Sequence, residues 1–346
     1  MLVPDESSST LMREIVNLAG GRFTWHVFAQ AACLRKARVN AFLEVPRETA
    51  LAAVAEGPLY SATLHSPIQC PTRYTEFVAR IIAIANQKGG VGKTTTAVNL
   101  AASLAVAEQR TLLVDGDPQG NATSGLGIER GAIRRTTYDA LLNLAPAAEA
   151  VLREVQFKAL DLIPATPDLA GAEIELVDFE ERDRAMRRAL EPLRSSYDFI
   201  LVDCPPSLGL LTVNMLAAAD AVLIPLQCEY YALEGLSQLL NTIHLVQRSI
   251  NEHLIVDGVI LTMYDARLNL SRQVASEARD YFGDKVYDSV IPRNVRLAEA
   301  PSFGKPIILY DVSSVGAVAY IQLAKEVIAR SGTLDPSQFV RDPVKT

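Results

Sequence analysis

Seven short apolar runs, separated by stretches with helical spacing, constrain the fold of this 346-residue chain more than any other feature. Strands buried on both faces of a sheet read as continuous apolar runs, and their alternation with helices favours parallel order. We therefore predict an α/β fold, a mostly parallel, doubly wound sheet with helices on both faces. The expected strands are Ile81–Ala85, Thr111–Val114, Leu160–Ile163, Phe199–Val202, Ala221–Leu226, Leu254–Thr262 and Lys285–Ile291. The expected helices are Thr94–Ala107, Leu208–Ala218, Tyr230–Ser249 and Ser314–Arg330.

The first 79 residues differ from the rest, with a serine run, scattered prolines and short apolar pieces that show no sustained periodicity. We expect residues 1–79 to form a weakly structured extension; a small regulatory domain and a misassigned start codon are the alternatives. Residues 80–331 are expected to form the folded domain. The tail, residues 332–346, contains Pro336 and Pro343 and few apolar residues, so we expect no amphipathic membrane helix there.

Composition excludes several classes of protein. The hydrophobic fraction of 49% suffices for a full core, while no apolar run approaches the ~18 to 20 residues of a membrane span. We therefore expect a cytoplasmic protein without membrane attachment. The net charge of −7 argues against coating of nucleic acid by bulk charge, so any DNA contact needs a local basic patch. The four cysteines, Cys33, Cys70, Cys204 and Cys228, form no C-x-x-C pair and indicate neither zinc nor disulfides.

A glycine-rich loop follows the first expected strand. In the run from Lys88 to Thr95, glycines let backbone N–H groups close around phosphate oxygens, and a lysine and a hydroxyl follow where a helix begins. Lys93 is expected to neutralise the β- and γ-phosphates of a nucleoside triphosphate, and Thr94 to hold Mg²⁺. The predicted sheet is therefore that of a P-loop NTPase.

The loop departs from the standard pattern G-x-x-x-x-G-K-[ST] at its start. Gln87 stands where that pattern requires glycine, and an additional lysine, Lys88, follows it. Because Lys93 already serves the phosphates, Lys88 could reach a nucleotide held by a neighbouring subunit. The loop thus hints at a dimer.

Acidic residues follow two other expected strands. Asp203 ends the run from Phe199, at the tip of a central strand, where a carboxylate can hold the water shell of Mg²⁺. Asp115 and Asp117 follow the strand at Thr111–Val114 and precede a turn rich in Pro, Gly and Asn. Such a pair could position the attacking water and respond to the γ-phosphate.

Four segments together closely resemble the ParA/Soj family of chromosome- and plasmid-partitioning ATPases. This family belongs to the deviant Walker A class, within the SIMIBI class of P-loop NTPases, which also contains MinD. The resemblance covers about residues 80–331. The segments are Lys88–Thr95, Asp115–Asn121, Asp203–Ser207 and Ile291–Pro306, of which the last is the most discriminating.

The resemblance implies roles for individual residues. Lys88 and Lys93 would act on the phosphates, with Lys88 crossing to the partner's nucleotide, and Asp117 would organise the hydrolytic water. Thr94 and Asp203 would serve Mg²⁺, with Asp115 supporting its shell. ATP would be bound by Lys88, Gly89, Gly90, Val91, Gly92, Lys93, Thr94, Thr95, Pro292 and Arg293, with Gln227–Gly235 bordering the adenine and the dimer interface.

The resemblance also implies a cargo and partners. Arg267 and Arg296 match the family's DNA-contacting arginines, and Arg272 and Lys305 could extend the patch. The implied function is an ATP-dependent switch: an ATP-bound homodimer binds DNA non-specifically on the nucleoid, and a ParB-like partition protein stimulates hydrolysis and releases it. A lone surface arginine is more commonly a solvated charge.

Two rival functions belong to the same superfamily. A membrane-bound positioning ATPase of the MinD type needs an amphipathic C-terminal helix, which the tail lacks. A metabolic or metallocluster ATPase needs bridging cysteines at characteristic positions. A GTPase is disfavoured because the chain contains no N-K-x-D guanine motif.

Overall fold

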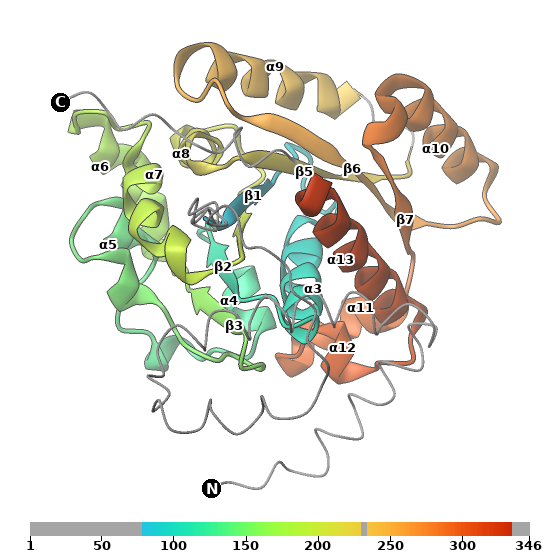
Figure 1. Cartoon of the computed structure of the whole chain (residues 1–346), viewed down its shortest axis with the longest axis horizontal. Coiled ribbons are helices and arrows are strands. Elements are labelled where there is room, and N and C mark those ends of the chain that lie inside the picture. The colour runs from blue at the N-terminus through green and yellow to red at the C-terminus, as the bar shows by residue number, and fades with distance from the viewer. Residues whose placement is uncertain (1–77, 230–233, 334–346) are drawn as a thin grey trace, which may run out of the picture. The chain divides into compact units, whose positions relative to one another are not determined.

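The computed structural model describes residues 78–229 and 234–333, all of which lie in one unit of the chain, Glu76–Thr346. Seven parallel strands form one sheet in the order β3-β2-β4-β1-β5-β6-β7 (Figure 1). All seven predicted strands are confirmed, with ends that shift by one or two residues. They are β1 Arg80–Ile84, β2 Thr111–Asp115, β3 Leu160–Ile163, β4 Phe199–Asp203, β5 Ala221–Gln227, β6 Ile255–Tyr264 and β7 Val286–Pro292.

Helices cover both faces of the sheet, as predicted. Successive side chains of β1 belong to two hydrophobic cores, one on each face of the sheet. Ile81 and Ala83 lie in the first core, and Ile82 and Ile84 lie in the second. The first core is closed by α5 Thr137–Leu141, α6 Ala172–Glu175, α7 Ala185–Leu190, α8 Leu210–Ala218, α9 Glu234–Ser249 and α10 Asn269–Phe282. The second is closed by α3 Lys93–Val106, α4 Asn121–Gly125, α11 Val295–Glu299, α12 Ile307–Tyr310 and α13 Val315–Thr333.

Short 3₁₀ turns connect these elements. They are η1 Arg130–Ala132, η2 Ala147–Ala150, η3 Pro167–Gly171, η4 Leu176–Asp178, η5 Glu191–Ser196, η6 Gly283–Lys285 and η7 Ala300–Phe303.

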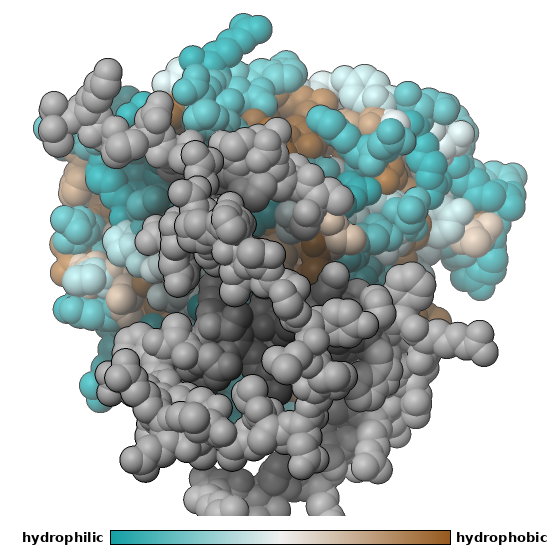
Figure 2. Space-filling view, in the orientation of Figure 1, coloured by the Kyte–Doolittle hydropathy of each residue, from teal (hydrophilic) through white to brown (hydrophobic). Residues whose placement is uncertain are grey.

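The four predicted helices are present as α3, α8, α9 and α13, although the predicted start of α9, residues 230–233, lies outside the described residues. The sequence interpretation included none of the short helices α4–α7, α11 and α12, and it also missed the longer helix α10. Its buried residues, Ser271, Val274, Ala275 and Ala278, recur at helical spacing, and this period was the available signal. Figure 2 shows a mostly hydrophilic surface over α10, at the right of the view. The polar composition of that outer face hid the narrow apolar stripe.

The topology creates a crevice beside the central strand. From β1 the chain crosses to β2 on one side of the sheet, whereas from neighbouring β4 it crosses to β5 on the other. Ligands in open α/β sheets bind at such a switch point, outside the carboxyl ends of the strands. The loops after β1, β2 and β4 all meet there.

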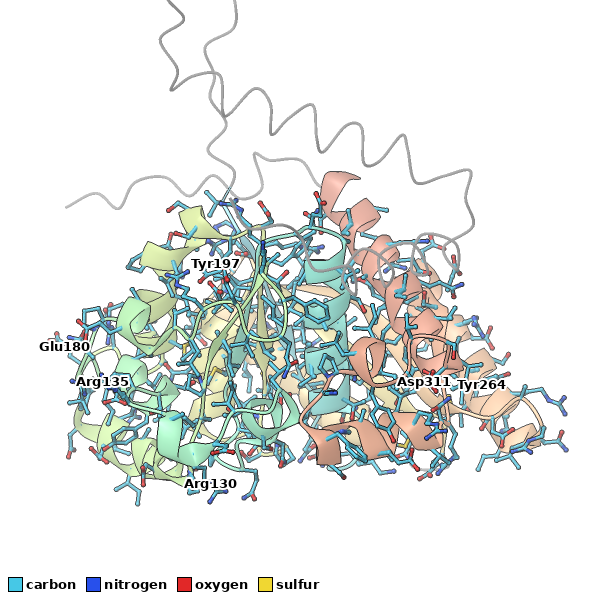
Figure 3. The ribbon with its side chains drawn as sticks, turned by 90° about the horizontal axis from the view of Figure 1, so that it is seen from below. Arg130, Arg135, Glu180, Tyr197, Tyr264 and Asp311 are labelled. Carbon is cyan, nitrogen blue, oxygen red and sulfur yellow. The ribbon has the colours of Figure 1, made fainter. Side chains whose placement is uncertain are left out.

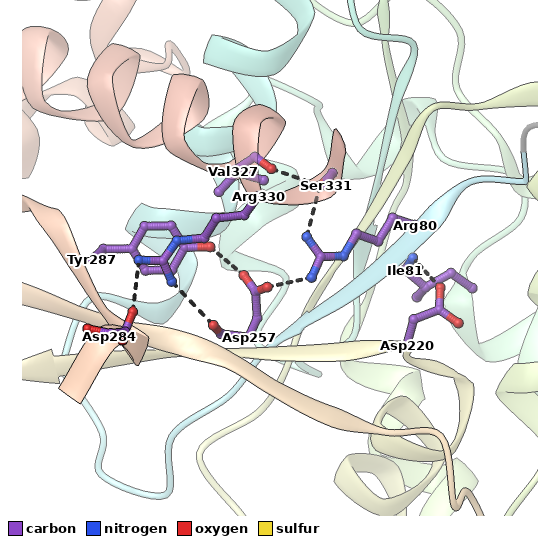
Figure 4. A network of polar contacts seen from close by, with 9 residues as sticks. All are labelled: Arg80, Ile81, Asp220, Asp257, Asp284, Tyr287, Val327, Arg330 and Ser331. Carbon is purple, nitrogen blue, oxygen red and sulfur yellow. Dashed lines mark hydrogen bonds and ion pairs between the residues drawn. The ribbon is translucent and has the colours of Figure 1, made fainter. Parts of the chain in front are cut away.

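A polar network fastens the opposite ends of the strands (Figure 4). The buried guanidinium of Arg80, at the start of β1, donates to Asp257 of β6 and to Ser331 of α13. Arg330 stacks over the Tyr287 ring at 3.8 Å and donates to the backbone oxygen of Asp257. Because the buried charges are paired, the C-terminal end of α13 is held to the sheet far from the crevice.

Candidate functional site

The glycine-rich loop leaves β1 and enters α3 at Lys93. Asn86 anchors its start, donating to the Pro225 carbonyl of β5 (2.7 Å) and accepting from the Lys88 N–H (3.0 Å). The Thr262 hydroxyl of β6 donates to the Val91 carbonyl (2.8 Å). Gly92 precedes the helix with φ of 90°, a left-handed conformation that a side chain would strain. Neighbouring strands thus hold the loop in place.

Lys93, the predicted phosphate ligand, lies inside the loop. Its side chain is 7% exposed, and its Nζ donates to the Lys88 carbonyl at 3.1 Å. Burial lowers its pKa, and nearby Asp203 opposes that shift. A buried cation with so little compensation favours an anionic ligand.

The two strand-end acids lie side by side, because Asp115 of β2 pairs in register with Asp203 of β4. Asp115 is fully buried, and its carboxylate accepts from the Thr123 backbone (2.8 Å), the Thr123 hydroxyl (2.6 Å) and the Asp117 N–H (3.2 Å). Burial outweighs these hydrogen bonds and raises the pKa of Asp115 to about 6. The carboxyl group therefore keeps its proton to a higher pH than an exposed aspartate does.

Asp203 is fully buried, and neither of its carboxylate oxygens has a hydrogen-bond partner in the structure. Burial, and next Asp115, raise its pKa well above the ordinary value. The Thr94 hydroxyl lies close enough to lower that pKa, yet it makes no hydrogen bond of normal geometry. Two orphaned oxygens beside a threonine are the donor set that a hydrated Mg²⁺ ion requires.

Among the described residues, no group of three or more His, Cys, Asp and Glu side chains is arranged to hold a metal ion. Mg²⁺ at phosphate sites needs no such cage, since waters and phosphate oxygens complete its six ligands. Asp203 and Thr94 therefore fit the ion without further acidic ligands.

Asp117 lies on the turn after β2, 7% exposed, and its Oδ1 accepts from the Gln119 N–H at 2.9 Å. The Gly116 N–H donates to the Asp203 backbone carbonyl at 3.0 Å, which binds this turn to the end of β4. The structure thus brings Asp117 to the same end of the sheet as Lys93.

A groove of about 400 Å³ adjoins the loop, with Lys88, Glu229 and Arg293 among its lining residues. Glu229 faces both cations, at 3.8 Å from the Lys88 Nζ and 3.4 Å from the nearest Arg293 nitrogen. The other lining residues are Cys228, Met263, Leu268, Leu270 and Ser271. Sequence reasoning placed Glu229 only in a broad bordering segment and missed its contacts, which depend on strands meeting in space.

The predicted DNA contacts follow neighbouring strands, Arg267 in the turn after β6 and Arg296 in α11 after β7. The Arg293 N–H donates to the Tyr264 carbonyl at 3.0 Å and so joins the ends of the two strands. Arg267 is 87% exposed and donates twice to Asp265, which lowers the pKa of that carboxyl to about 2. Arg296 donates to Glu299 at 3.1 Å. Both arginines therefore have an acidic partner within their own chain.

Cys204 and Cys228 are buried and unpaired, and burial raises the pKa of both thiols, that of Cys228 to about 11. Neither is poised as a thiolate, in agreement with the structural role predicted for them. In the part of the chain that the structure describes, no helix combines the length and hydropathy needed to cross a bilayer. α13 extends through Thr333, and residues 334–346 of the predicted C-terminal tail lie outside the described residues.

Comparison with known proteins identifies relatives over most of the chain. A family profile described as an AAA domain matches residues 79–256. The chromosome partitioning protein ParA of Myxococcus xanthus (strain DK1622) is 59% identical over 263 residues, which are 76% of this chain and 93% of that protein. The sporulation initiation inhibitor protein Soj of Bacillus subtilis (strain 168) is 61% identical over 252 residues, covering 73% and 99%.

Among solved structures, cobyrinic acid a,c-diamide synthase from Mycobacterium smegmatis, with bound ATP analogue and magnesium, matches with a TM-score of 0.65 and 38% identity. The match covers 74% of this chain and 97% of that one. The fold described above is therefore similar to that of a protein whose structure was solved with an ATP analogue and magnesium bound.

Proposed function

Because the chain belongs to the ParA/Soj family of chromosome-partitioning ATPases, we propose that it is an ATP-dependent switch that binds and releases DNA. The chain is an ATPase of this family, and its cofactors are ATP and Mg²⁺. We assign this activity to residues 80–331.

Lys93 and Thr94 are the residues proposed to bind at the phosphate end of ATP. Replacement of the Lys88 carbonyl by phosphate oxygens would compensate the buried ammonium group of Lys93. Asp203 and Thr94 would hold Mg²⁺, which when bound neutralises charge that develops on the phosphates, and Asp115 would support its water shell.

We assign orientation of the attacking water to Asp117, whose loop is fastened to both Asp115 and the end of β4. A water-orienting carboxylate lowers the barrier mainly by positioning. Hydrolysis by the isolated protein is expected to be slow, because the population of ATP-bound protein is the signal. A ParB-like partner would then accelerate it.

Dimerisation is assigned to Lys88 and the residues around it. The Lys88 side chain is 36% exposed, and its Nζ lies 3.8 Å from a Glu229 carboxylate oxygen. An ion pair this long and this exposed contributes little to stability. The phosphates of ATP held by a second subunit offer this cation a stronger partner. ATP would thus join two subunits face to face.

Binding of DNA is assigned to Arg267 and Arg296. The chain carries a net charge of −7, so two arginines on one subunit bind the phosphate backbone weakly, and pairing two copies doubles the patch. Non-specific DNA binding should therefore require the ATP-bound dimer, which would place the protein on the nucleoid.

The observation that carries the proposal is the convergence of Lys93, Asp203 and Asp115 at the switch point of the sheet. The test is size-exclusion chromatography and DNA retention with ATP, ADP or no nucleotide at low salt. ATP alone should produce dimers that retain DNA. Equal retention without ATP, or no retention under any condition, contradicts the switch.

Two variants separate the steps of the cycle. Asp117→Ala should bind ATP, dimerise and persist on DNA, because hydrolysis no longer ends the bound state. Arg267→Glu should dimerise with ATP yet fail to retain DNA. Normal hydrolysis by Asp117→Ala would remove that residue from the catalytic assignment.

A further inference from the structure

Asn99 lies in α3, one turn after the glycine-rich loop, and links that loop to a distant segment. Its side chain is 4% exposed, and its Nδ2 donates to the Thr95 carbonyl at 2.7 Å. Its Oδ1 accepts from the Ile307 N–H, the first residue of α12, also at 2.7 Å. One amide therefore joins the helix that follows the phosphate loop to the start of α12.

Helix α12 in turn holds Arg296. At its end, Tyr310 donates its hydroxyl to Glu299 at 3.0 Å, and the same Glu299 oxygen accepts from Arg296. The Asp311 carboxylate lies 3.6 Å from the Arg296 Nε. Figure 3 shows Asp311 on the same side of the molecule as Tyr264, whose strand leads to Arg267. The rotamer of Arg296 thus depends on where α12 lies.

A second contact connects the same segment with the acidic side of the site. Asp115 holds Thr123 in α4, and the loop that follows packs Gly127 directly against Gly304 at the end of η7. A Cβ at Gly304 would lie 2.6 Å from the Gly127 Cα, so only glycine allows this approach. Gln156 bridges the two loops, donating to the Leu126 carbonyl (2.9 Å) and to the Gly304 carbonyl (3.1 Å).

We propose that residues 295–311 form a relay that couples the nucleotide state of the loop to the position of Arg296, with Asn99 and the Gly127–Gly304 contact as its two joints. The inference rests on the DNA-binding role proposed for Arg296. Asn99 and Gln156 are positioning residues, since their side chains bond to backbone groups that join one segment to another. Packed segments joined at two points move together, because close-packed interfaces do not deform continuously.

The relay predicts reciprocal coupling. If ATP tightens DNA binding, DNA must tighten ATP binding by the same factor, and loss of a joint must reduce both factors equally. A purely structural role for Asn99 would lower the melting temperature but leave the ratio of DNA affinities with and without ATP unchanged. That ratio is therefore the informative measurement.

Asn99→Ala removes the first joint, and Asn214→Ala is its matched control. Asn214 is also buried in a helix, donates to the carbonyl four residues earlier (Leu210, 3.0 Å) and accepts a backbone N–H from another helix (Met186, 3.3 Å). It donates in addition to the Arg182 carbonyl (2.8 Å), so its loss removes at least as many side-chain-to-backbone bonds as the loss of Asn99. None of these bonding partners belongs to residues 295–311. Both variants lose the same type of bonds, and only one of them is at a joint.

The experiment measures the dissociation constant of the full chain for a fluorescent DNA duplex, with and without ATP, and that for ATP with and without DNA. Asn99→Ala should still bind ATP, but the factor by which ATP lowers the dissociation constant for DNA should be about tenfold smaller than in the wild type. The factor by which DNA lowers the dissociation constant for ATP should decrease equally. Asn214→Ala should keep the wild-type ratio. Full tightening in Asn99→Ala, or an equal loss in Asn214→Ala, overturns the relay.

The wild-type arm separates the two proposals. If ATP does not tighten DNA binding by the wild type, the switch itself fails. If the wild type responds and Asn99→Ala responds equally, the relay alone is wrong. Should Asn99→Ala not fold, Gln156→Ala decides, because this exposed side chain can be shortened without a buried cavity. It should reduce the same ratio, and an unchanged ratio contradicts the relay.

Discussion

Two groups of charged residues at the same end of the sheet differ in their exposure to solvent. The buried centre, almost completely removed from solvent, consists of Lys93, Asp115 and Asp203. The exposed rim, with much of its side-chain surface in solvent, consists of Lys88, Arg293, Arg267 and Arg296. The buried centre holds charges without full compensation, as the orphaned oxygens of Asp203 illustrate. Every cation of the exposed rim has an acidic partner in its own chain.

The difference separates two ways of preparing for a ligand. The buried centre destabilises the folded protein when no ligand is bound, because its desolvated charged groups lack counter-charges. The exposed rim costs little folding free energy, because solvent and neighbouring carboxylates satisfy its cations. A ligand that binds these cations must displace those carboxylates. Substitutions at the centre should therefore change chemistry and stability, whereas substitutions at the rim should change association and its salt dependence.

The largest expected effect concerns Lys93. Lys93→Gln should lower the rate of ATP hydrolysis by about 1000-fold, because it removes the buried cation that would face the transferred phosphate. Phosphate release under saturating ATP measures this effect. Lys158→Gln, at an exposed lysine, is the control and should hydrolyse normally. A small loss in Lys93→Gln would mean that the buried centre does not carry the chemistry.

The pH dependence of stability tests the burial of Asp115. Its folded pKa of about 6 exceeds the reference value of 3.8, so the folded state binds more protons between these values. The contribution of Asp115 to the free energy of unfolding should fall by at most about 3 kcal/mol as pH rises from 4 to 6. Urea unfolding of the nucleotide-free wild type and Asp115→Asn isolates it. A wild type that gained stability relative to Asp115→Asn as the pH rose would indicate an ion-paired carboxylate instead.

Asp203→Asn should separate activity from stability. Loss of the carboxylate should weaken Mg²⁺-dependent hydrolysis about 10- to 100-fold. The nucleotide-free variant should nevertheless melt a few degrees higher at pH 8, roughly 1 kcal/mol, because a buried carboxyl group without a hydrogen-bond partner, beside Asp115, is replaced by a neutral amide. Calorimetry and phosphate release on the same preparation provide both values. A lower melting temperature would show that the charge is compensated in solution.

The smallest effect is expected at the rim. Arg267→Gln should weaken ATP-dependent DNA binding about tenfold and reduce the slope of log K against log salt by about one per arginine lost. Arg135→Gln is the matched control, since Arg135 donates to Asp139 at 2.9 Å much as Arg267 donates to Asp265, and Figure 3 shows it on the opposite side from Tyr264. Equal slopes in the two variants would remove Arg267 from the DNA surface.

The sequence by itself determined the seven strands, their parallel order and the phosphate loop, because each depends on local apolar runs and glycines. It did not reveal α10, whose outer face is too polar for its short apolar stripe to stand out. Nor did it show that Asp115 would be held by Thr123, or that Glu229 would face Lys88 and Arg293.

Those contacts were decided only by the tertiary structure. Asp115 meets Asp203 because β2 and β4 pair in register, although 87 residues lie between them in the chain. Asn99 meets Ile307 because α3 and α12 share one face of the sheet. A residue's own type and neighbours specify its strand or loop, whereas its pKa and its bonding partners depend on which distant elements the fold packs against it.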